Sequence, residues 1–253
     1  MKILEGKVSI VTGAGSGMGR AIAKIYAREG SFVVVADVNL KTAEETVKLI
    51  EDAGGKGCAV LVDVTKEEDI KKMFDCAVEK FGTVDILVNN AGIMDNFEPA
   101  EDMTDELWDK VFAVNTTSVM RTTRKAIPIF KEKGKGVIIN ITSAGGLYGS
   151  RAGAAYTASK HAVTGFTHNV GFQYALLGIR CNAIAPGAVK TNIGSTITNP
   201  DEFGSSRAMA GMSLNPRSGE PEEVAEVALF LASDKSSFVN GETVKVDGGW
   251  TAY

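Results

Sequence analysis

The chain has 253 residues, 44% of them hydrophobic and 23% charged, which is enough apolar material for one sizeable core. Its 27 Lys and Arg against 31 Asp and Glu give a net charge of −4, which argues against partners such as nucleic acid or an anionic membrane surface. Cys58, Cys76 and Cys181 lack the spacing of a disulfide framework or a zinc site, and no apolar run is long enough to span a bilayer, so we expect a cytoplasmic protein without a metal.

Short runs rich in Val and Ile alternate with longer amphipathic stretches, the pattern of a βαβ protein. We predict seven strands, at 8–12, 32–36, 58–62, 85–89, 136–143, 179–186 and 242–249. We predict helices at 17–29, 40–53, 66–81, 104–132, 156–177 and 221–233, two of them capped by Thr65 and Thr104. Strands that are apolar on both faces indicate an α/β fold, a doubly wound parallel sheet with helices on both faces. We expect one domain over 1–253, with 187–220 as a loop at the substrate site.

A glycine-rich turn, TGAGSGMG at 12–19, follows the first strand and leads into a helix. Glycines there let backbone N–H groups approach a pyrophosphate at the helix N-terminus. The spacing of Gly13, Gly17 and Gly19 differs from the GxGxxG fingerprint of the ordinary dinucleotide fold. On the glycines alone, a plain strand-to-helix turn is therefore an equal alternative.

Asp37 ends the second strand, where a carboxylate can accept hydrogen bonds from ribose hydroxyls. It would repel a ribose 2′-phosphate about 4 Å away by roughly 4 kcal/mol at an effective dielectric of about 20. Neither Ser16 nor Val38 offers a compensating positive charge. We therefore predict NAD rather than NADP, with a simple strand-end turn as the alternative interpretation of Asp37.

Two further loops follow strand ends on the same rim of the predicted sheet, Asp63-Val64 after the third strand and Asn89-Asn90-Ala91-Gly92 after the fourth. Ligands of open α/β sheets bind beyond the carboxyl ends of the strands. The position of these loops, more than their residue types, makes them candidates for cofactor binding.

Tyr156 and Lys160 lie in AAYTASKHA, and a helix there places both side chains on one face. Tyrosine ordinarily titrates near ~10, so acid/base chemistry near neutrality requires a shift of about 3 units, or roughly 4 kcal/mol. We expect the Lys160 ammonium to supply much of that shift, helped by the positive charge of an oxidised nicotinamide. Pairs with this spacing also arise by chance in many helices.

Ser143 and Asn115 are further candidates. Ser143 ends the fifth strand on the same rim, where its hydroxyl could hold a carbonyl oxygen. Asn115 lies in the apolar segment VFAVNTTSV and needs a polar partner, such as an ordered water of a proton relay. The structural alternatives are a strand cap for Ser143 and a satisfied core amide for Asn115.

In this order, the motifs resemble those of the short-chain dehydrogenase/reductase family. The match covers nearly the whole chain and also includes Arg180-Cys-Asn182, Pro186-Gly187 and DGG at 247–249. The resemblance implies a single Rossmann-type domain that transfers hydride between a nicotinamide and a secondary alcohol or ketone. It implies that Tyr156 is the acid/base, that Lys160 lowers the pKa of Tyr156 and binds the nicotinamide ribose, that Ser143 orients the substrate oxygen, and that Asn115 sustains the proton relay.

The cofactor contacts expected from the motifs and the resemblance are Gly13, Ser16, Gly17, Met18, Gly19, Asp37, Asp63, Val64, Asn90, Ala91, Gly92, Tyr156, Lys160, Pro186, Gly187, Val189 and Thr191. Family resemblance also implies a homotetramer, in which helices 104–132 and 156–177 pair across a dimer and the tail with Trp250 and Tyr253 joins the tetramer.

Other functions and interpretations stay open. The chain also resembles NADPH-dependent 3-oxoacyl-carrier-protein reductases and sugar or polyol dehydrogenases, although Asp37 argues against NADPH and Leu177 stands where such reductases tend to have an arginine. A non-catalytic NAD-sensing or scaffold protein would be expected to have lost one of the four catalytic candidates. Arg151 could meet an anionic substrate or be a solvated surface residue. The apolar residues of 187–220 could form a lid over the substrate or pack the loop down: Phe203, Met209, Met212 and Leu214.

Overall fold

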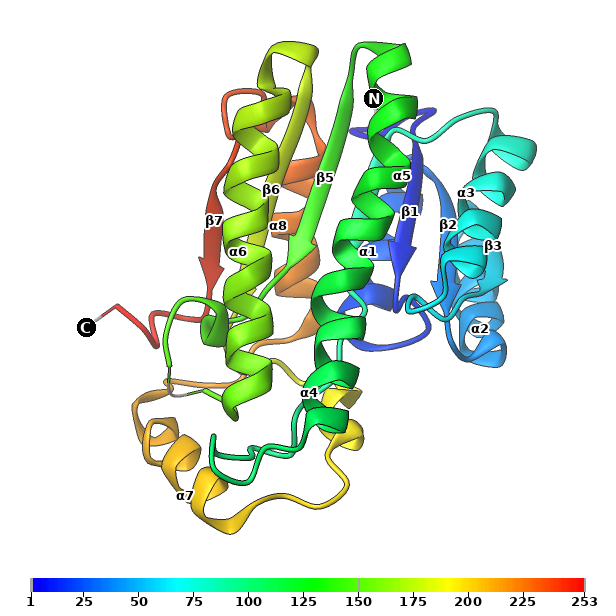
Figure 1. Ribbon diagram of the computed structural model, residues 1–253. Coiled ribbons are helices and arrows are strands. Elements are labelled where there is room, and N and C mark those ends of the chain that lie inside the picture. The colour runs from blue at the N-terminus through cyan, green and yellow to red at the C-terminus, as the bar shows by residue number, and fades with distance from the viewer. Residues whose placement is uncertain (1, 150, 253) are drawn as a thin grey trace.

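The computed structural model describes residues 2–149 and 151–252. A seven-stranded parallel sheet lies at its centre, in the order β3-β2-β1-β4-β5-β6-β7 (Figure 1). The strands are β1 (Val8–Thr12), β2 (Phe32–Asp37), β3 (Lys56–Leu61), β4 (Ile86–Asn89), β5 (Gly136–Ile141), β6 (Ile179–Pro186) and β7 (Thr243–Val246). The predicted α/β fold is therefore confirmed. The chain proceeds outward in one direction from β1 and in the other from β4, so the topological switch point, where ligands of such sheets bind, lies between these two strands.

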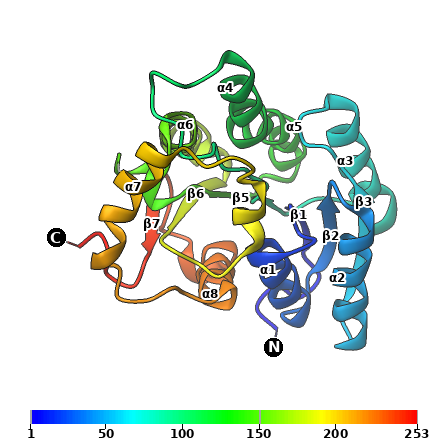
Figure 2. The same ribbon diagram turned by 90° about the horizontal axis from the view of Figure 1, so that it is seen from below.

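Helices cover both faces of the sheet, as Figure 2 shows from below. The layer of α1, α2 and α8 packs against one face, and the layer of α3, α5 and α6 packs against the other. Alternate strand residues point to opposite layers: Val11 joins the first core and Ile10 the second. The helices are α1 (Gly17–Arg28), α2 (Leu40–Asp52), α3 (Glu67–Phe81), α4 (Asp105–Phe112), α5 (Ser118–Lys133), α6 (Ala154–Tyr174), α7 (Glu202–Ala210) and α8 (Pro221–Ala232).

The helix predicted at 104–132 is interrupted, which corrects the sequence-based expectation. A π-helical turn over Ala113–Thr117 separates α4 from α5, and Asn115 lies within that turn. The periodicity of apolar residues continues through the turn, so the sequence pattern alone does not reveal it. Such turns insert an extra residue into a helix and often occur at functional sites.

One of the two predicted helix caps is confirmed and the other is wrong. The Thr104 side chain accepts a hydrogen bond from the Leu107 backbone N–H at 3.2 Å, as expected for the first turn of α4. Helix α3 instead has Lys66 as its N-cap residue. Thr65 does not cap this helix because its hydroxyl donates to the Asp63 carboxylate at 2.7 Å.

The segment 187–220 is more ordered than a loop. It contains α7, capped by the Asp201 side chain, which accepts from the Gly204 N–H at 2.6 Å. The sequence EFGSSRAMA has no clear apolar stripe, so periodicity did not indicate this helix. Figure 1 places α7 and its flanking segments beyond the carboxyl ends of the strands, opposite the N-terminal end of α4. None of the helices in the described part of the chain is long and apolar enough to cross a bilayer.

Candidate active site

The glycine-rich turn between β1 and α1 leaves no room for larger residues. Gly13 and Gly17 have φ values of +63° and +51°, which favour glycine. A Cβ on Gly13 would lie 3.0 Å from the Cα of Ala91, and one on Gly19 would collide with the Gly13 carbonyl oxygen. Among the described residues, the N-cap Ser16 makes no side-chain cap hydrogen bond, so N–H groups of the first turn of α1 remain available to a ligand. This cradle of bare backbone fits the pyrophosphate of a dinucleotide.

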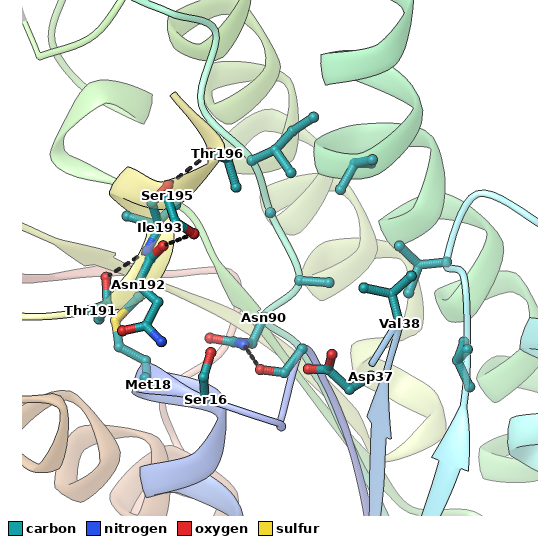
Figure 3. Close-up of a pocket in the computed structure, with 18 of the residues that line it drawn as sticks. Ser16, Met18, Asp37, Val38, Asn90, Thr191, Asn192, Ile193, Ser195 and Thr196 are labelled. Atoms are coloured by element: carbon teal, nitrogen blue, oxygen red, sulfur yellow. Dashed lines mark hydrogen bonds between the residues drawn. The ribbon is translucent and has the colours of Figure 1, made fainter. Parts of the chain in front are cut away.

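A cavity of about 420 Å³ opens in front of this turn (Figure 3). Figure 3 shows Asp37 and Val38 at one end and Thr191 and Asn192 at the other, with Ser16 between them. The structure brings most of the expected cofactor residues to this one cavity: Gly13, Ser16, Gly17, Met18, Asp37, Asp63, Val64, Asn90, Ala91, Gly92 and Thr191. Gly19 lies behind the lining, where its role is to allow the close approach of Gly13.

Asp37 is oriented by backbone hydrogen bonds at the end of β2. One carboxylate oxygen accepts from the Gly15 N–H at 2.8 Å, and the other accepts from the Asn39 N–H at 2.9 Å. Arg20, a nearby cation, is engaged elsewhere because its Nε donates to the Thr46 hydroxyl at 2.9 Å. Among the described residues that line the cavity, Lys110 of α4 is the only basic one. The Asp37 end of the cavity is therefore negatively charged.

Asn90 braces the glycine-rich turn. Its amide Nδ2 donates to the carbonyl oxygens of Thr12 at 2.9 Å and Gly13 at 3.1 Å. The Thr12 hydroxyl in turn accepts from the backbone N–H groups of Asn90 and Ala91 at 3.0 and 3.1 Å. These bonds join the ends of β1 and β4 at the switch point, so the NNAG segment holds the cradle in shape as well as lining the cavity.

A second cavity, of about 210 Å³, adjoins the first, because Met18, Thr191 and Ile193 line both. It contains the expected catalytic and nicotinamide-end residues Ser143, Tyr156, Pro186, Gly187 and Val189. Its remaining walls are mostly apolar: Met94, Ala144, Ala188, Met212 and Trp250. The glycine-rich cradle and the Ser143–Tyr156 pair therefore lie in neighbouring cavities that share a wall.

Tyr156 and Lys160 lie on one face of α6, as predicted, and burial is the largest influence on the pKa of both side chains. Burial raises the pKa of Tyr156 to about 12, Asp95 adds to the increase, and a hydrogen bond with Ser143 opposes it. Burial also lowers the pKa of Lys160 to about 8. The Lys160 ammonium donates to the Ile141 carbonyl oxygen at 2.9 Å, so burial of the phenol outweighs any attraction to this amine.

Asn115 is held in the π turn beside these residues. Its amide exchanges two hydrogen bonds with the backbone of Ile93, at 2.9 and 3.0 Å, and donates to the Ser159 hydroxyl at 3.2 Å. A Cβ on Gly92 would lie 3.3 Å from both the Asn115 amide oxygen and the Lys160 amine nitrogen. Asn115 is thus a well-bonded buried amide that lies close to Lys160.

Two residues near Tyr156 were not indicated by the motifs. The Asp95 carboxylate, fully buried in the loop after β4, accepts a hydrogen bond from the Tyr156 backbone N–H at 2.7 Å. The indole of Trp250 donates to the Gly211 carbonyl oxygen at 2.8 Å and stacks with the Arg151 guanidinium, whose Cζ lies 4.2 Å from the ring centroid. Asp95 could have been suspected as an acidic residue soon after the NNAG segment.

The proposed lid and tail residues are placed differently from one another. Met212 lines the second cavity, whereas Phe203, Met209 and Leu214 are largely exposed, so these three neither cover the cavity nor pack the loop down. Arg151 is half-buried and lines the second cavity. Trp250 is buried against its own chain, and Tyr253 lies outside the described residues.

Comparisons with known proteins agree with this geometry. The model of the family described as Enoyl-(Acyl carrier protein) reductase matches residues 13–251. A 3β-hydroxysteroid dehydrogenase of Eggerthella lenta is 47% identical over 99% of this chain and 97% of its own. A 3-oxoacyl-[acyl-carrier-protein] reductase of Thermotoga maritima is 38% identical over 97% and 98%, and a cyclohexanol dehydrogenase of an Acinetobacter species is 38% identical over 97% and 95%. A crystal structure of levodione reductase, 35% identical, superposes with a TM-score of 0.91 over 99% of this chain and 100% of that one.

Proposed function

Since this chain belongs to the short-chain dehydrogenase/reductase family of oxidoreductases, we propose that it interconverts a secondary alcohol and a ketone with NAD(H). The observation that carries the proposal is the shared wall of the two cavities. This shared wall places a cradle suited to a pyrophosphate next to a smaller space lined by Ser143 and Tyr156. A dinucleotide bound along this path would extend toward the Tyr156 hydroxyl.

The preference for NAD(H) rests on Asp37. Its carboxylate is fixed by the N–H groups of Gly15 and Asn39 at the end of the larger cavity where an adenosine ribose would bind. A carboxylate there can accept hydrogen bonds from ribose hydroxyls and repels a 2′-phosphate. Asp63, Val64 and the NNAG segment would complete the adenosine side, and Val189 and Thr191 the nicotinamide side.

The proposed chemistry is proton transfer at Tyr156 coupled to hydride transfer. The bound nicotinamide supplies or accepts the hydride, and in its oxidised form its positive charge favours the phenolate. Tyr156 removes the proton of the substrate hydroxyl in the oxidative direction and returns it in reduction. Ser143 holds the substrate oxygen, the buried amine of Lys160 stabilises the phenolate and binds ribose hydroxyls, and Asn115 supports the path by which the proton leaves.

The apolar second cavity favours a cyclic secondary alcohol or ketone. Met94, Met212 and Trp250 offer large apolar contacts and leave the polar groups at one end. The names of the Eggerthella and Acinetobacter relatives point in the same direction, toward a steroid and a cyclohexanol. The Thermotoga relative keeps a 3-oxoacyl-carrier-protein substrate as the second candidate, although an NADPH-dependent enzyme would have to accommodate Asp37.

We propose that residues 1–253 act as one dinucleotide-binding and catalytic domain and that 187–220 closes over the substrate. We further propose that the protein is cytoplasmic. We also propose that it forms a homotetramer, because copies of the chain could cover the groove between α5 and α6. Sedimentation of the purified protein as a monomer would contradict the tetramer.

A panel of substrates with both cofactors tests the function. Cyclohexanone, a 3-oxosteroid and a 3-oxoacyl carrier protein would each be assayed with NADH and NADPH, and the matching alcohols with NAD⁺ and NADP⁺. We expect turnover of a cyclic ketone and a clear preference for NADH. Preferred use of NADPH would contradict the interpretation of Asp37. Binding of NADH with no turnover of any substrate would favour the sensing or scaffold alternative.

A further inference from the structure

Asp95 is a buried carboxylate whose position nothing in the proposed proton path explains. It lies in the loop after β4, with 0% of its surface exposed. A carboxylate in such a place is costly unless hydrogen bonds replace its hydration. The bonds it makes hold the first turn of α6, and the next residue along the chain, Asn96, bonds to the segment 187–220.

The first of these connections is to α6, the helix of Tyr156. One Asp95 oxygen accepts from the Gly153 N–H at 3.1 Å, and the other accepts from the Tyr156 N–H at 2.7 Å. The N-cap residue of α6 is Gly153, which has no side chain to bind these N–H groups. Asp95 therefore caps the helix from a distant segment and places a negative charge at the positive end of the helix dipole. A Cβ on Gly153 would lie 2.6 Å from the Asp95 carboxylate, so glycine makes this approach possible.

The second connection is to 187–220. Asn96 and Phe97, the two residues after Asp95, have φ values of +58° and +62°, an uncommon conformation for non-glycine residues that marks a constrained segment. The Asn96 side-chain oxygen accepts from the Thr198 N–H at 3.0 Å, and its carbonyl oxygen accepts from the Asp201 N–H at 2.9 Å. The turn that aims Asp95 at α6 thereby also holds the segment leading into α7.

We propose that Asp95 is a positioning residue for the reaction. It fixes the first turn of α6 so that the Tyr156 hydroxyl faces the cavity, and its negative charge disfavours ionisation of that hydroxyl. This role rests on the proposed acid/base function of Tyr156. The carboxylate of Asp95 raises the pKa of Tyr156, as expected for a negative charge held close to the phenol. Its charge adds to the larger effect of burial, and both favour the protonated phenol.

Other charged groups also face Tyr156 and must be kept constant in any test. Lys160 lies one turn further along α6, with its amine nitrogen 5.6 Å from the Tyr156 ring centroid. Arg151, from the loop before α6, lines the same cavity. Glu98 and Asp201 belong to the segments bonded to Asp95 and Asn96. A change confined to Asp95 leaves all of these in place.

The test compares Asp95→Asn with Asp85→Asn. Asparagine keeps the shape of Asp95 and one acceptor oxygen but removes the charge. We expect the pH at which kcat/KM for alcohol oxidation reaches half its plateau to fall by about 0.5 to 1 unit, with a loss in kcat larger than the change in KM. Asp85 is the matched control because it also accepts a hydrogen bond from a backbone N–H, that of Val8 at 2.8 Å, and pairs with Lys133. It directly precedes β4 and so lies at the amino ends of the strands, away from the site. Its variant should lose thermal stability with the pH midpoint unchanged.

A second measurement needs neither substrate nor cofactor. The absorbance of tyrosinate is recorded after a rapid pH jump, for the protein with Tyr156 and for the same protein carrying Tyr156→Phe. The difference between the two reports the ionisation of Tyr156 alone. We expect a midpoint near 12 for the unmodified chain and a lower one, by the same 0.5 to 1 unit, for Asp95→Asn. Should Asp95→Asn not fold, Asp95→Ser retains a helix-capping oxygen without the charge and takes its place.

The two measurements separate the possible failures. If both midpoints in the Asp95 variant equal those of the unmodified chain, Asp95 has only a structural role and the proposal is overturned. If the absorbance midpoint falls but the unmodified chain turns over no alcohol or ketone, the electrostatic effect of Asp95 stands and the proposed function fails.

Discussion

The ammonium of Lys160 donates a hydrogen bond to the carbonyl oxygen of Ile141 at 2.9 Å, while its nitrogen lies 5.6 Å from the centroid of the Tyr156 ring. The amine and the phenol are thus neighbours on α6 without being bonded to each other. Burial raises the pKa of the phenol and lowers that of the amine. The protein groups by themselves therefore keep Tyr156 protonated, and the proposed activity requires the charge of the oxidised cofactor to favour the phenolate.

Replacing Lys160 by Met should change how stability depends on pH. The native pKa of Lys160 is about 8 and the ordinary value is 10.5, so between these values the unfolded chain binds the proton more strongly. The free energy of unfolding of the unmodified chain should therefore rise with pH across this window. Below a pH of about 8 the folded chain carries the full penalty of burying a charged amine. Lys160→Met removes that penalty, about 3 kcal/mol, but also removes the hydrogen bond to Ile141, about 1 kcal/mol.

Denaturant unfolding at a series of pH values checks this expectation. Near neutrality the Met variant should be more stable by about 2 kcal/mol, and the difference should shrink as the pH approaches 10.5. Parallel pH dependences of the two proteins would show that Lys160 titrates normally in the folded state.

Replacing Asp37 by Ser should relax the choice of cofactor. Loss of the carboxylate removes the repulsion of a 2′-phosphate, at most roughly 4 kcal/mol and less where solvent screens it, so we expect kcat/KM with NADPH relative to NADH to rise by about 10- to 100-fold. Asp63→Ser is the matched control, because Asp63 lines the same cavity but its carboxylate is engaged with Thr65 at 2.7 Å. An equal change in the cofactor ratio for both variants would remove the special role of Asp37.

A single methyl group on Gly19 should disrupt the cradle. The added carbon would collide with the Gly13 carbonyl oxygen, so we expect NADH affinity to fall by at least about 10-fold and the melting temperature to fall by several degrees. Gly165→Ala makes the same change in α6 at a position where, apart from the adjoining backbone of α6 itself, no described atom lies within 4 Å of the added carbon. It should leave NADH affinity unchanged and increase stability by up to about 1 kcal/mol. Fluorescence titration and calorimetry of both variants measure these effects.

The sheet and the site motifs could be predicted from the sequence because each rests on a local pattern. The apolar run containing Ile10 and Val11 predicts a strand buried on both faces, and parallel strands bring their carboxyl ends to one rim. Gly13, Asp37 and Asn90 follow such ends, so their convergence on one cavity follows from the topology. The spacing of Tyr156 and Lys160 predicts their common helix face.

Other features depend on tertiary contacts that no local pattern encodes. The π turn at Asn115 leaves the apolar periodicity intact. Helix α7 is capped by Asp201, and its Gly204 makes room for the carbonyl oxygen of Phe97. Asp95 acts on α6 across a long stretch of sequence. The pKa of Tyr156 depends on burial, which the sequence does not quantify, and the expected lowering of that pKa by Lys160 stays a prediction.

The central claim is that the Tyr156 hydroxyl takes part in the reaction as the proton donor to the ketone. Its most direct test is the reduction of a cyclic ketone with NADH by the unmodified chain and by Tyr156→Phe. Loss of the proton donor should lower kcat by at least about 100-fold, because general acid/base catalysis typically contributes 10²- to 10⁴-fold, while the Kd for NADH stays within about twofold. A phenylalanine variant that binds NADH normally and retains more than about a tenth of kcat would contradict a role for the Tyr156 hydroxyl in the reaction.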